Sequence, residues 1–445
     1  MPFSNALWIP TILFAVVGHV GLALPLAAET KNTHRPNILF IMADDVGSEA
    51  LECYGGQSYR TPRLNQLARE GLRFEHAYSM AVCHPTRIAL LSGRYPVRLG
   101  NPQWGTYPKE EESRTLAHLL ANAGYATAIA GKWQLALLGD DPTHPQRLGF
   151  QESCLFGWHE GPRYYQPLIW QNGEVRSDVH DRYGPDVYCD FLIDFMTRKR
   201  DQPFFAYYPM ALCHAVTNDL DKPVPVGPNG RYQNFAEMVA AMDERVGRLL
   251  DALDSAGLRE RTLVLFYSDN GSPARTITGT RGDELIYEPV NSLRENVEIP
   301  GGKALLTDSG TRVPLIARWP GVVTPGGVTE DLVDVSDFLP TFAELADVPL
   351  SRDRPIDGHS FVGLLDGNAE SRRSWVFAEH KDQSFVKDQR WKLYSDGRFF
   401  DMGTDAEEQH PLKPDQLGTD AQTAHLKLAK ALDGLSESLV SHPEP

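Results

Sequence analysis

The stretch RPNILFIMADD, residues 35–45, has the pattern of a buried strand that ends in two carboxylates. Its middle is an unbroken apolar run, which is typical of a parallel strand covered by helices on both faces. Asp44 and Asp45 then stand at the carboxyl end of the strand, where open α/β sheets place their sites. This stretch therefore predicts an α/β fold with a functional site at the strand ends.

The same helix–strand alternation continues along the chain. We expect a helix in 61–70 that stops at Gly71 and a strand that runs to Ser79. Ser113 is the expected cap of the next helix, which stops at Gly124 before a strand that carries Lys132. Two further helix–strand units, in residues 184–214 and 233–270, bring their strand ends near His214 and to Asp269 and Asn270. The alternation predicts a large mixed, mostly parallel sheet sandwiched by helices.

Three segments divide the 445 residues. Residues 1–28 contain no Asp, Glu, Lys or Arg, and their apolar middle ends at Ala27 and Ala28, as in an export signal; an uncleaved anchor is the alternative. Residues 29–349 form the predicted catalytic domain. Residues 350–445 contain short strand-like runs and a terminal helix over 420–438, which predicts a small antiparallel sheet plus helix. We expect the folded part to be exported, to the periplasm or outside the cell.

The net charge of −16 limits the partners of this protein. A surface that follows nucleic acid needs the opposite sign, so nucleic acid is excluded as a partner, and no stable membrane partner is expected. An anionic substrate would need a local cluster of cations. The five cysteines are an odd number for an exported protein. If Cys83 is chemically special, Cys53, Cys154, Cys189 and Cys213 can form two disulfides or remain buried thiols.

The acids at the strand ends indicate a metal site. Asp44, Asp45, Asp269 and Asn270 offer only oxygen ligands, a set that suits Ca²⁺ or, less well, Mg²⁺, and does not suit zinc. A soft thiolate at Cys83 makes poor sense beside such a hard cation.

Cys83 lies in the stretch AVCHPTRIALLSGR, residues 81–94. CHPTR resembles the C-x-P-x-R signature of the type I sulfatases, a family of the alkaline-phosphatase-like superfamily in which this cysteine is oxidised after synthesis to Cα-formylglycine. Further blocks in the same order resemble that family: NILFIMADDVGSEALECYGG, GYATAIAGKW, LFYSDNG and GGKALLTDSGTRVPLIARWPG, with DGHSFVGLL and RWKLYSDGRFFDM near the end.

The resemblance implies a role for each matching residue. Asp44, Asp45, Asp269 and Asn270 would bind Ca²⁺ together with the formylglycine nucleophile at Cys83. Arg87 would hold the formylglycine, and Lys132, His214 and Lys303 would contact the sulfate and the ester oxygen. The resemblance also implies a formylglycine-generating or sulfatase-maturating enzyme as partner. The implied reaction is hydrolysis of aryl or carbohydrate sulfates, small molecules or glycans, to an alcohol and inorganic sulfate.

Two positions depart from the family pattern. The family usually has GKWH where this chain has GKWQ, so Gln134 replaces a histidine credited with taking a proton during turnover. Glutamine cannot act as that base. TDSGTRVP also replaces the Glu-Gly-Gly that often precedes Arg-Val-Pro.

Alternative functions remain open at this point. The first is a phosphonate monoester or phosphodiester hydrolase of the same superfamily. The second is a non-catalytic sulfated-glycan-binding protein, if Gln134 abolishes turnover. A hydrolase with a cysteine nucleophile is the weakest alternative.

The sequence offers further candidates around the site. Trp158, Trp170 and the pair Tyr164–Tyr165 could stack on sugar rings, although aromatic residues more often belong to a core. Residues 272–301 are a predicted substrate rim. His84, at the variable position of the signature, has no assigned role.

Overall fold

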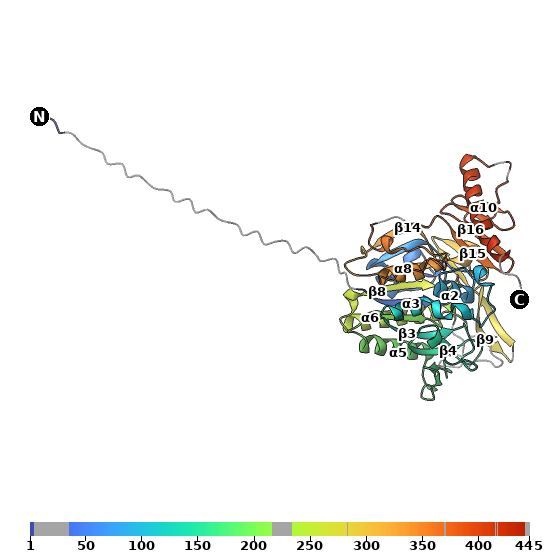
Figure 1. Cartoon of the computed structure of the whole chain (residues 1–445), viewed down its shortest axis with the longest axis horizontal. Helices are drawn as coiled ribbons and strands as arrows, with labels where there is room; N and C mark the ends of the chain where they lie inside the picture. Colours follow the sequence, from blue (N-terminus) through green and yellow to red (C-terminus); the bar gives the residue numbers. More distant parts are fainter. Residues whose placement is uncertain are drawn as a thin grey trace. The chain divides into compact units, whose positions relative to one another are not determined.

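A ten-stranded sheet forms the centre of the fold, with the order β14-β2-β13-β8-β1-β7-β3-β4-β5-β6. The computed structural model shown in Figure 1 describes residues 1–3, 35–215, 234–282, 284–368, 371–413, 415 and 417–440. The segment predicted as an export signal, 1–28, lies outside the described residues except for its first three. Residues 35–445 form one unit by their contacts.

Four parallel strands occupy the middle of this sheet: β8 (Thr262–Ser268), β1 (Asn37–Ala43), β7 (Phe204–Pro209) and β3 (Ala126–Trp133). Every residue in them is buried, because helices cover both faces. Ala43 pairs with Ser268 across β1 and β8, so the acids that follow the two strands emerge side by side.

Alternate side chains of β1 enter two separate cores. Phe40 belongs to the core shared with α2 (Cys83–Ser92), α3 (Leu116–Asn122) and α8 (Phe338–Leu345). Ile41 belongs to the core shared with α1 (Pro62–Arg69), α5 (Gly184–Arg198) and α6 (Phe235–Ser255). The continuous apolar run of β1 follows from this double burial.

The outer strands make the sheet mixed. On one side β13 (Arg312–Arg318) runs antiparallel to both β8 and β2 (Leu72–Tyr78), and β14 (Gly327–Asp334) is parallel to β2. On the other side β4 (Glu152–Gly157) is parallel to β3, and the two-residue strands β5 (Trp170–Gln171) and β6 (Glu174–Val175) are antiparallel. The predicted mixed, mostly parallel sheet is confirmed.

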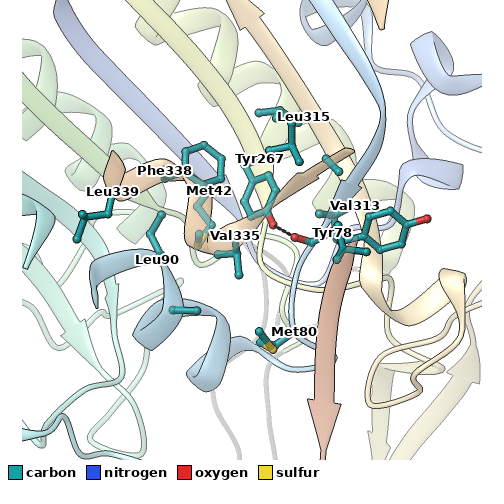
Figure 2. Close-up of a cluster of buried hydrophobic side chains, with 14 of the residues drawn as sticks. Met42, Tyr78, Met80, Leu90, Tyr267, Val313, Leu315, Val335, Phe338 and Leu339 are labelled. Carbon is teal, nitrogen blue, oxygen red and sulfur yellow. Dashed lines mark hydrogen bonds between the residues drawn. The ribbon is translucent and has the colours of Figure 1, made fainter. Parts of the chain in front are cut away.

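The core under α2 fixes the start of that helix. Figure 2 shows Leu90 of α2 among Val335, Phe338 and Leu339, with Met42 and Tyr267 alongside. The Tyr267 hydroxyl donates a hydrogen bond of 2.6 Å to the backbone carbonyl of Tyr78, which ends β2 just before α2. The entry into α2, where Cys83 lies, is therefore held by packing and by a buried hydrogen bond.

The C-terminal part forms a small antiparallel sheet with a helix, as predicted. Its strands are β15 (Val376–His380), β16 (Gln383–Lys387), β17 (Trp391–Tyr394) and β18 (Phe399–Asp401), followed by α10 (Thr419–Val440). Buried side chains of this sheet, such as Phe377 and Phe385, belong to the same core as Phe40. The boundary between 349 and 350 stays a prediction.

Shorter elements complete the fold. The expected cap at Ser113 is wrong: residues Lys109–Arg114 form a 3-10 helix, and the Thr115 side chain accepts the backbone N–H of His118 to cap α3. The predicted rim contains two hairpins, β9 (Arg275–Arg281) with β10 (Glu284–Pro289), and β11 (Asn291–Arg294) with β12 (Val297–Pro300). The remaining helices are α4 (His144–Arg147), α7 (Asp308–Thr311), α9 (Val362–Leu365), η1 (Ser48–Ala50), η2 (Glu52–Tyr54), η3 (Pro96–Leu99), η5 (Arg259–Arg261) and η6 (Val335–Asp337).

All five cysteines are free thiols in the structure. None of the five cysteines is in a disulfide; Cys53 is partly buried and the other four are buried. Of the two arrangements left open for Cys53, Cys154, Cys189 and Cys213, the structure thus has free thiols.

Within the described ranges, no helix combines the length and the apolar character needed to cross a membrane.

Candidate active site

Four oxygen-bearing side chains meet where β1 and β8 end. The Asp45 backbone N–H donates to Asp269 Oδ1 over 3.2 Å, and Asn270 Nδ2 donates to Asp45 Oδ1 over 2.8 Å. Asp44, Asp45, Asp269 and Asn270 are all buried, at 2% exposure or less. Asp45 adopts a φ of 65°, which turns the chain sharply after the strand. The predicted metal-binding group is therefore a single cluster in the structure.

Cys83 adjoins this cluster from the start of α2. Its Sγ and one oxygen each of Asp44 and Asp269 lie within 4.8 Å of one another. One turn further along α2, Arg87 Nη2 donates to Asp269 Oδ2 over 2.5 Å. The Thr86 hydroxyl donates to the Asp269 carbonyl over 2.7 Å. These contacts, with the core beneath, lock the first turn of α2 onto the loop that follows β8.

Two lysines from different parts of the chain form ion pairs with the adjacent carboxylates of Asp44 and Asp45. Lys132, at the end of β3, is buried, and its Nζ lies 2.6 Å from Asp44 Oδ2. Lys303 follows the rim hairpins, and its Nζ lies 2.6 Å from Asp45 Oδ1. Its backbone N–H donates to the Ser272 carbonyl over 2.9 Å, which returns the chain to the site. The site thus holds two ammonium groups and the Arg87 guanidinium, a local cationic cluster in an acidic protein.

His214 completes the group from the segment after β7. One of its ring nitrogens lies within 4.8 Å of oxygens of Asp44 and Asp45. Its Nδ1 lies 2.9 Å from the Ala215 carbonyl, which can only accept, and 3.5 Å from Arg163 Nη1, which can only donate, so the two contacts favour opposite tautomers of the ring. The structure therefore brings together Cys83, Arg87, Lys132, His214, Lys303 and the four metal-ligand candidates.

The buried charges shift one another's pKa values in both directions. Burial opposes ionisation of Asp44, but Lys132, His214 and Arg87 outweigh it and lower its pKa. Burial raises the pKa of Asp45, and burial together with the nearby Asp44 raises the pKa of Asp269 to about 7. The pKa of His214 falls well below 6.5 because of burial and the charge of Lys303. Crowded acids of this kind need a strong positive charge to stay ionised together.

The donor set fits a hard divalent cation. Asp44 Oδ1 and Asn270 Oδ1 are buried, and neither has a hydrogen-bond partner among the residues that the structure describes. A buried oxygen without a partner is costly, and metal coordination would satisfy both atoms. The other candidate ligands, Asp45 and Asp269, add oxygens at the same place. The cluster is compatible with a divalent metal, and its oxygens do not by themselves select Ca²⁺ over Mg²⁺.

Gln134 stands apart from these contacts. It follows β3 and is 1% exposed, and its amide oxygen and nitrogen both lack a hydrogen-bond partner within the described part of the chain. Among the residues that the structure describes, no basic side chain forms a hydrogen bond with Gln134.

Sequence reasoning missed Arg163. This buried side chain lies over the Phe156 ring at 5.1 Å and places Nη1 3.5 Å from His214 Nδ1. It follows β4, the neighbour of β3, so its position after a strand end was the available signal.

Comparisons with known proteins agree with this geometry. The family model described as Sulfatase matches residues 36–348, and the model described as N-sulphoglucosamine sulphohydrolase, C-terminal, matches residues 302–430. The chain is 33% identical to arylsulfatase A of Homo sapiens, over 80% of this chain and 73% of that protein. It is 31% identical to N-acetylgalactosamine-6-sulfatase of Homo sapiens, over 83% and 75%. The solved structure of Ps i-CgsB in complex with k-i-k-neocarrahexaose has a TM-score of 0.73 at 23% identity, covering 91% of this chain and 93% of that one.

Proposed function

The chain belongs to the sulfatase family, which hydrolyses sulfate esters, and we propose that it does so with a formylglycine derived from Cys83 and a bound Ca²⁺. One observation carries this proposal. The Cys83 side chain, three carboxylates and three buried or partly buried cations converge beside the ends of β1, β3 and β8. A plain thiol in this acid-rich group has no evident chemical use.

Asp44, Asp45, Asp269 and Asn270 would hold the Ca²⁺, with the modified residue 83 beside them. When bound, the ion supplies positive charge next to the formylglycine, whose hydrated form offers the attacking hydroxyl and a second hydroxyl for release of sulfate. The unpartnered oxygens of Asp44 and Asn270 support this assignment.

The cations of the chain bind and orient the sulfate group. Lys132 belongs to β3 and Lys303 follows β12, and each pairs with a different carboxylate. Two separate ammonium groups are therefore available to a substrate anion. Arg87 is fixed by its hydrogen bond to Asp269, a carboxylate that also lies beside residue 83. Because these groups are held in place before the reaction, they stabilise developing negative charge without reorganising.

His214 handles the proton of the leaving alcohol. Its ring lies beside the carboxylates of Asp44 and Asp45 and within the influence of the Lys303 charge. A bound sulfate ester adds negative charge nearby, which favours the protonated imidazole that donation requires. Lys303, beside it, is the second candidate donor.

Carbohydrate or aryl sulfates are the proposed substrates. The names of the relatives include an arylsulfatase and an N-acetylgalactosamine-6-sulfatase, and the structure of Ps i-CgsB holds a carbohydrate. Export fits such substrates, and the proposed partner during synthesis is the enzyme that converts Cys83.

The deciding experiment is a mass spectrum of the tryptic peptide spanning residues 74–87 from protein made in its native host. The proposal expects loss of sulfur and two hydrogens and gain of one oxygen at Cys83. An unmodified thiol in protein that releases sulfate would overturn it. The same preparation, assayed on an aryl sulfate and an aryl phosphodiester, should favour the sulfate. Activity lost to a chelator should return with Ca²⁺ rather than Mg²⁺.

A further inference from the structure

An exposed aromatic cluster lies beside the candidate active site. Trp104 is 46% exposed, although large apolar side chains usually bury. Its ring stacks on His84, with centroids 5.5 Å apart and planes 21° apart. Trp158 also packs against Trp104, with centroids 5.5 Å apart and planes 38° apart. Two indole rings therefore form a tilted surface that is open to solvent.

Both tryptophans are anchored to segments that carry catalytic candidates. His84, which backs Trp104, directly follows Cys83 and is itself 2% exposed. Its Nε2 is held 2.9 Å from the Thr106 carbonyl, which fixes the ring plane. The Trp158 backbone N–H donates to the Trp133 carbonyl over 3.1 Å, next to Lys132. The aromatic surface is thus attached at one end to residue 83 and at the other to the sulfate-binding lysine.

Among the aromatic residues that the sequence suggested for sugar stacking, some belong to the core and one lies at the surface. Tyr164 is 1% exposed, and its hydroxyl donates to the Ala211 carbonyl, so it belongs to the core. Trp170 packs against the main core from β5. Trp158 instead joins Trp104 at the surface. His84 and Trp158 both pack against the Trp104 indole, and Trp104 still remains 46% exposed.

We propose that Trp104 and Trp158 form a stacking platform for a pyranose ring of a sulfated saccharide, with the sulfate group held by Lys132 and Lys303. This inference rests on the proposed function and names its substrate as a carbohydrate. The apolar C–H face of a sugar fits an indole face, while its hydroxyl groups stay hydrated at an open surface.

The platform suggests a structural role for His84, whose ring packs against Trp104. His84 occupies the variable position of the C-x-P-x-R signature, and stacking on Trp104 requires a flat ring there.

The test compares Trp104→Ala and Trp158→Ala with Trp104→Tyr, which keeps an aromatic face, and with Trp170→Ala as a control away from the platform. All are assayed as formylglycine-containing protein on monosulfates of galactose, N-acetylgalactosamine and N-acetylglucosamine. Each alanine variant should raise KM about ten-fold, the size of one stacking contact, with a smaller change in kcat. The Tyr variant should recover most of the loss, and Trp170→Ala should leave KM near that of the wild type.

Inorganic sulfate separates a local effect from a structural one. It fills the cationic group without touching the platform, so its inhibition constant should stay constant in both alanine variants. An inhibition constant that rises with KM, or a KM that does not change, would overturn the stacking role. Wild-type protein that cleaves 4-nitrophenyl sulfate but none of the saccharide sulfates would overturn this inference and leave the proposed function intact. Protein that carries formylglycine yet cleaves neither would overturn the proposed function, and the platform with it.

Discussion

At the residue scale, Gln134 combines deep burial with an amide that makes no hydrogen bond among the described residues. A buried amide in this condition costs free energy, and a partner from substrate or water would relieve it. The sulfatase pattern usually has a histidine at this position, and the resemblance implies that this histidine takes a proton during turnover. Glutamine has no basic nitrogen, so the last step should be slow in this protein.

The first prediction follows from that contrast. Gln134→His should raise steady-state kcat on 4-nitrophenyl sulfate by about ten-fold or more, because a positioned general base is worth roughly 10²-fold or above. Rapid-mixing assays should show an initial burst of nitrophenol in the wild type that shrinks in the variant. Gln134→Asn is the matched control, since it changes the side chain without adding a base. An equal rate in the wild type and the histidine variant would show that another group accepts the proton.

The second prediction concerns Lys132, whose ammonium group lies 2.6 Å from Asp44 Oδ2. Lys132→Ala should lower kcat/KM about 10²- to 10³-fold, the usual cost of one preorganised charge-stabilising group, and should weaken inhibition by inorganic sulfate. The control is Lys387→Met, because Lys387 is equally buried but lies in β16. It should change the melting temperature and leave sulfate inhibition unaffected. Equal effects of both variants on sulfate inhibition would remove Lys132 from the binding site.

At the element scale, apolar strands with polar ends were the predictable part of the molecule. β1, β3, β7 and β8 are buried on both faces, so each carries a continuous apolar run, and the residues after them could be grouped from sequence. The two rim hairpins were not predictable, because most residues of β10 and β12 are exposed and lack an apolar pattern. Arg163 and Trp104 lie in loops, where periodicity gives no signal. The α3 cap was misplaced because a 3-10 helix precedes it.

The third prediction tests the junction between β15 and η3. Glu379 of β15 accepts the Val97 backbone N–H over 2.9 Å, and burial raises its pKa from 4.5 to about 7 in spite of that bond. The folded state therefore keeps a proton that the unfolded chain gives up between pH 4.5 and pH 7. The free energy of unfolding contributed by this group is present below pH 4.5 and is lost as the pH rises to about 7.

Replacing the carboxylic acid with an amide removes this pH dependence. Glu379→Gln keeps an acceptor for Val97 and should stabilise the protein at pH 8 by up to about 3 kcal/mol, with little effect at pH 5. The measurement is the difference in melting temperature between variant and wild type across this pH range. Glu174→Gln is the control, because Glu174 is exposed in β6. A difference that is the same at both pH values would contradict the buried-acid explanation.

At the scale of the whole molecule, the catalytic layers and the C-terminal sheet share one core. Phe377, Phe385 and Leu428 belong to the same buried cluster as Phe40 and Leu90. The pattern of apolar and turn residues in the sequence separates the two parts, because short strand-like runs begin after residue 350. This pattern does not show whether the apolar faces of the two parts pack together. The contacts indicate that the C-terminal sheet unfolds together with the rest.

Arg373 joins these two parts through buried polar contacts. Its Nε donates to Asp337 Oδ2 of η6 over 2.7 Å, and its Nη1 donates to the Tyr95 hydroxyl over 3.1 Å. A third bond, from Nη2 to the Asp357 carbonyl, spans 2.9 Å. Arg373 precedes β15, so this network connects the C-terminal sheet to the segment that follows α2. Removing the guanidinium would leave the Asp337 carboxylate buried without its counter-charge.

The fourth prediction is that Arg373→Met lowers the free energy of unfolding by about 3 to 5 kcal/mol, as expected when one partner of a buried ion pair is lost. Its neighbour Arg372 is exposed, so Arg372→Met is the matched control and should stay within about 0.5 kcal/mol of the wild type.

Heating should abolish sulfate release and shift tryptophan fluorescence in one transition, in the wild type and in the variant. A C-terminal sheet that melts first, while sulfate release persists, would show two folding units rather than one. The shared core requires a single transition, because neither part can bury its apolar face alone.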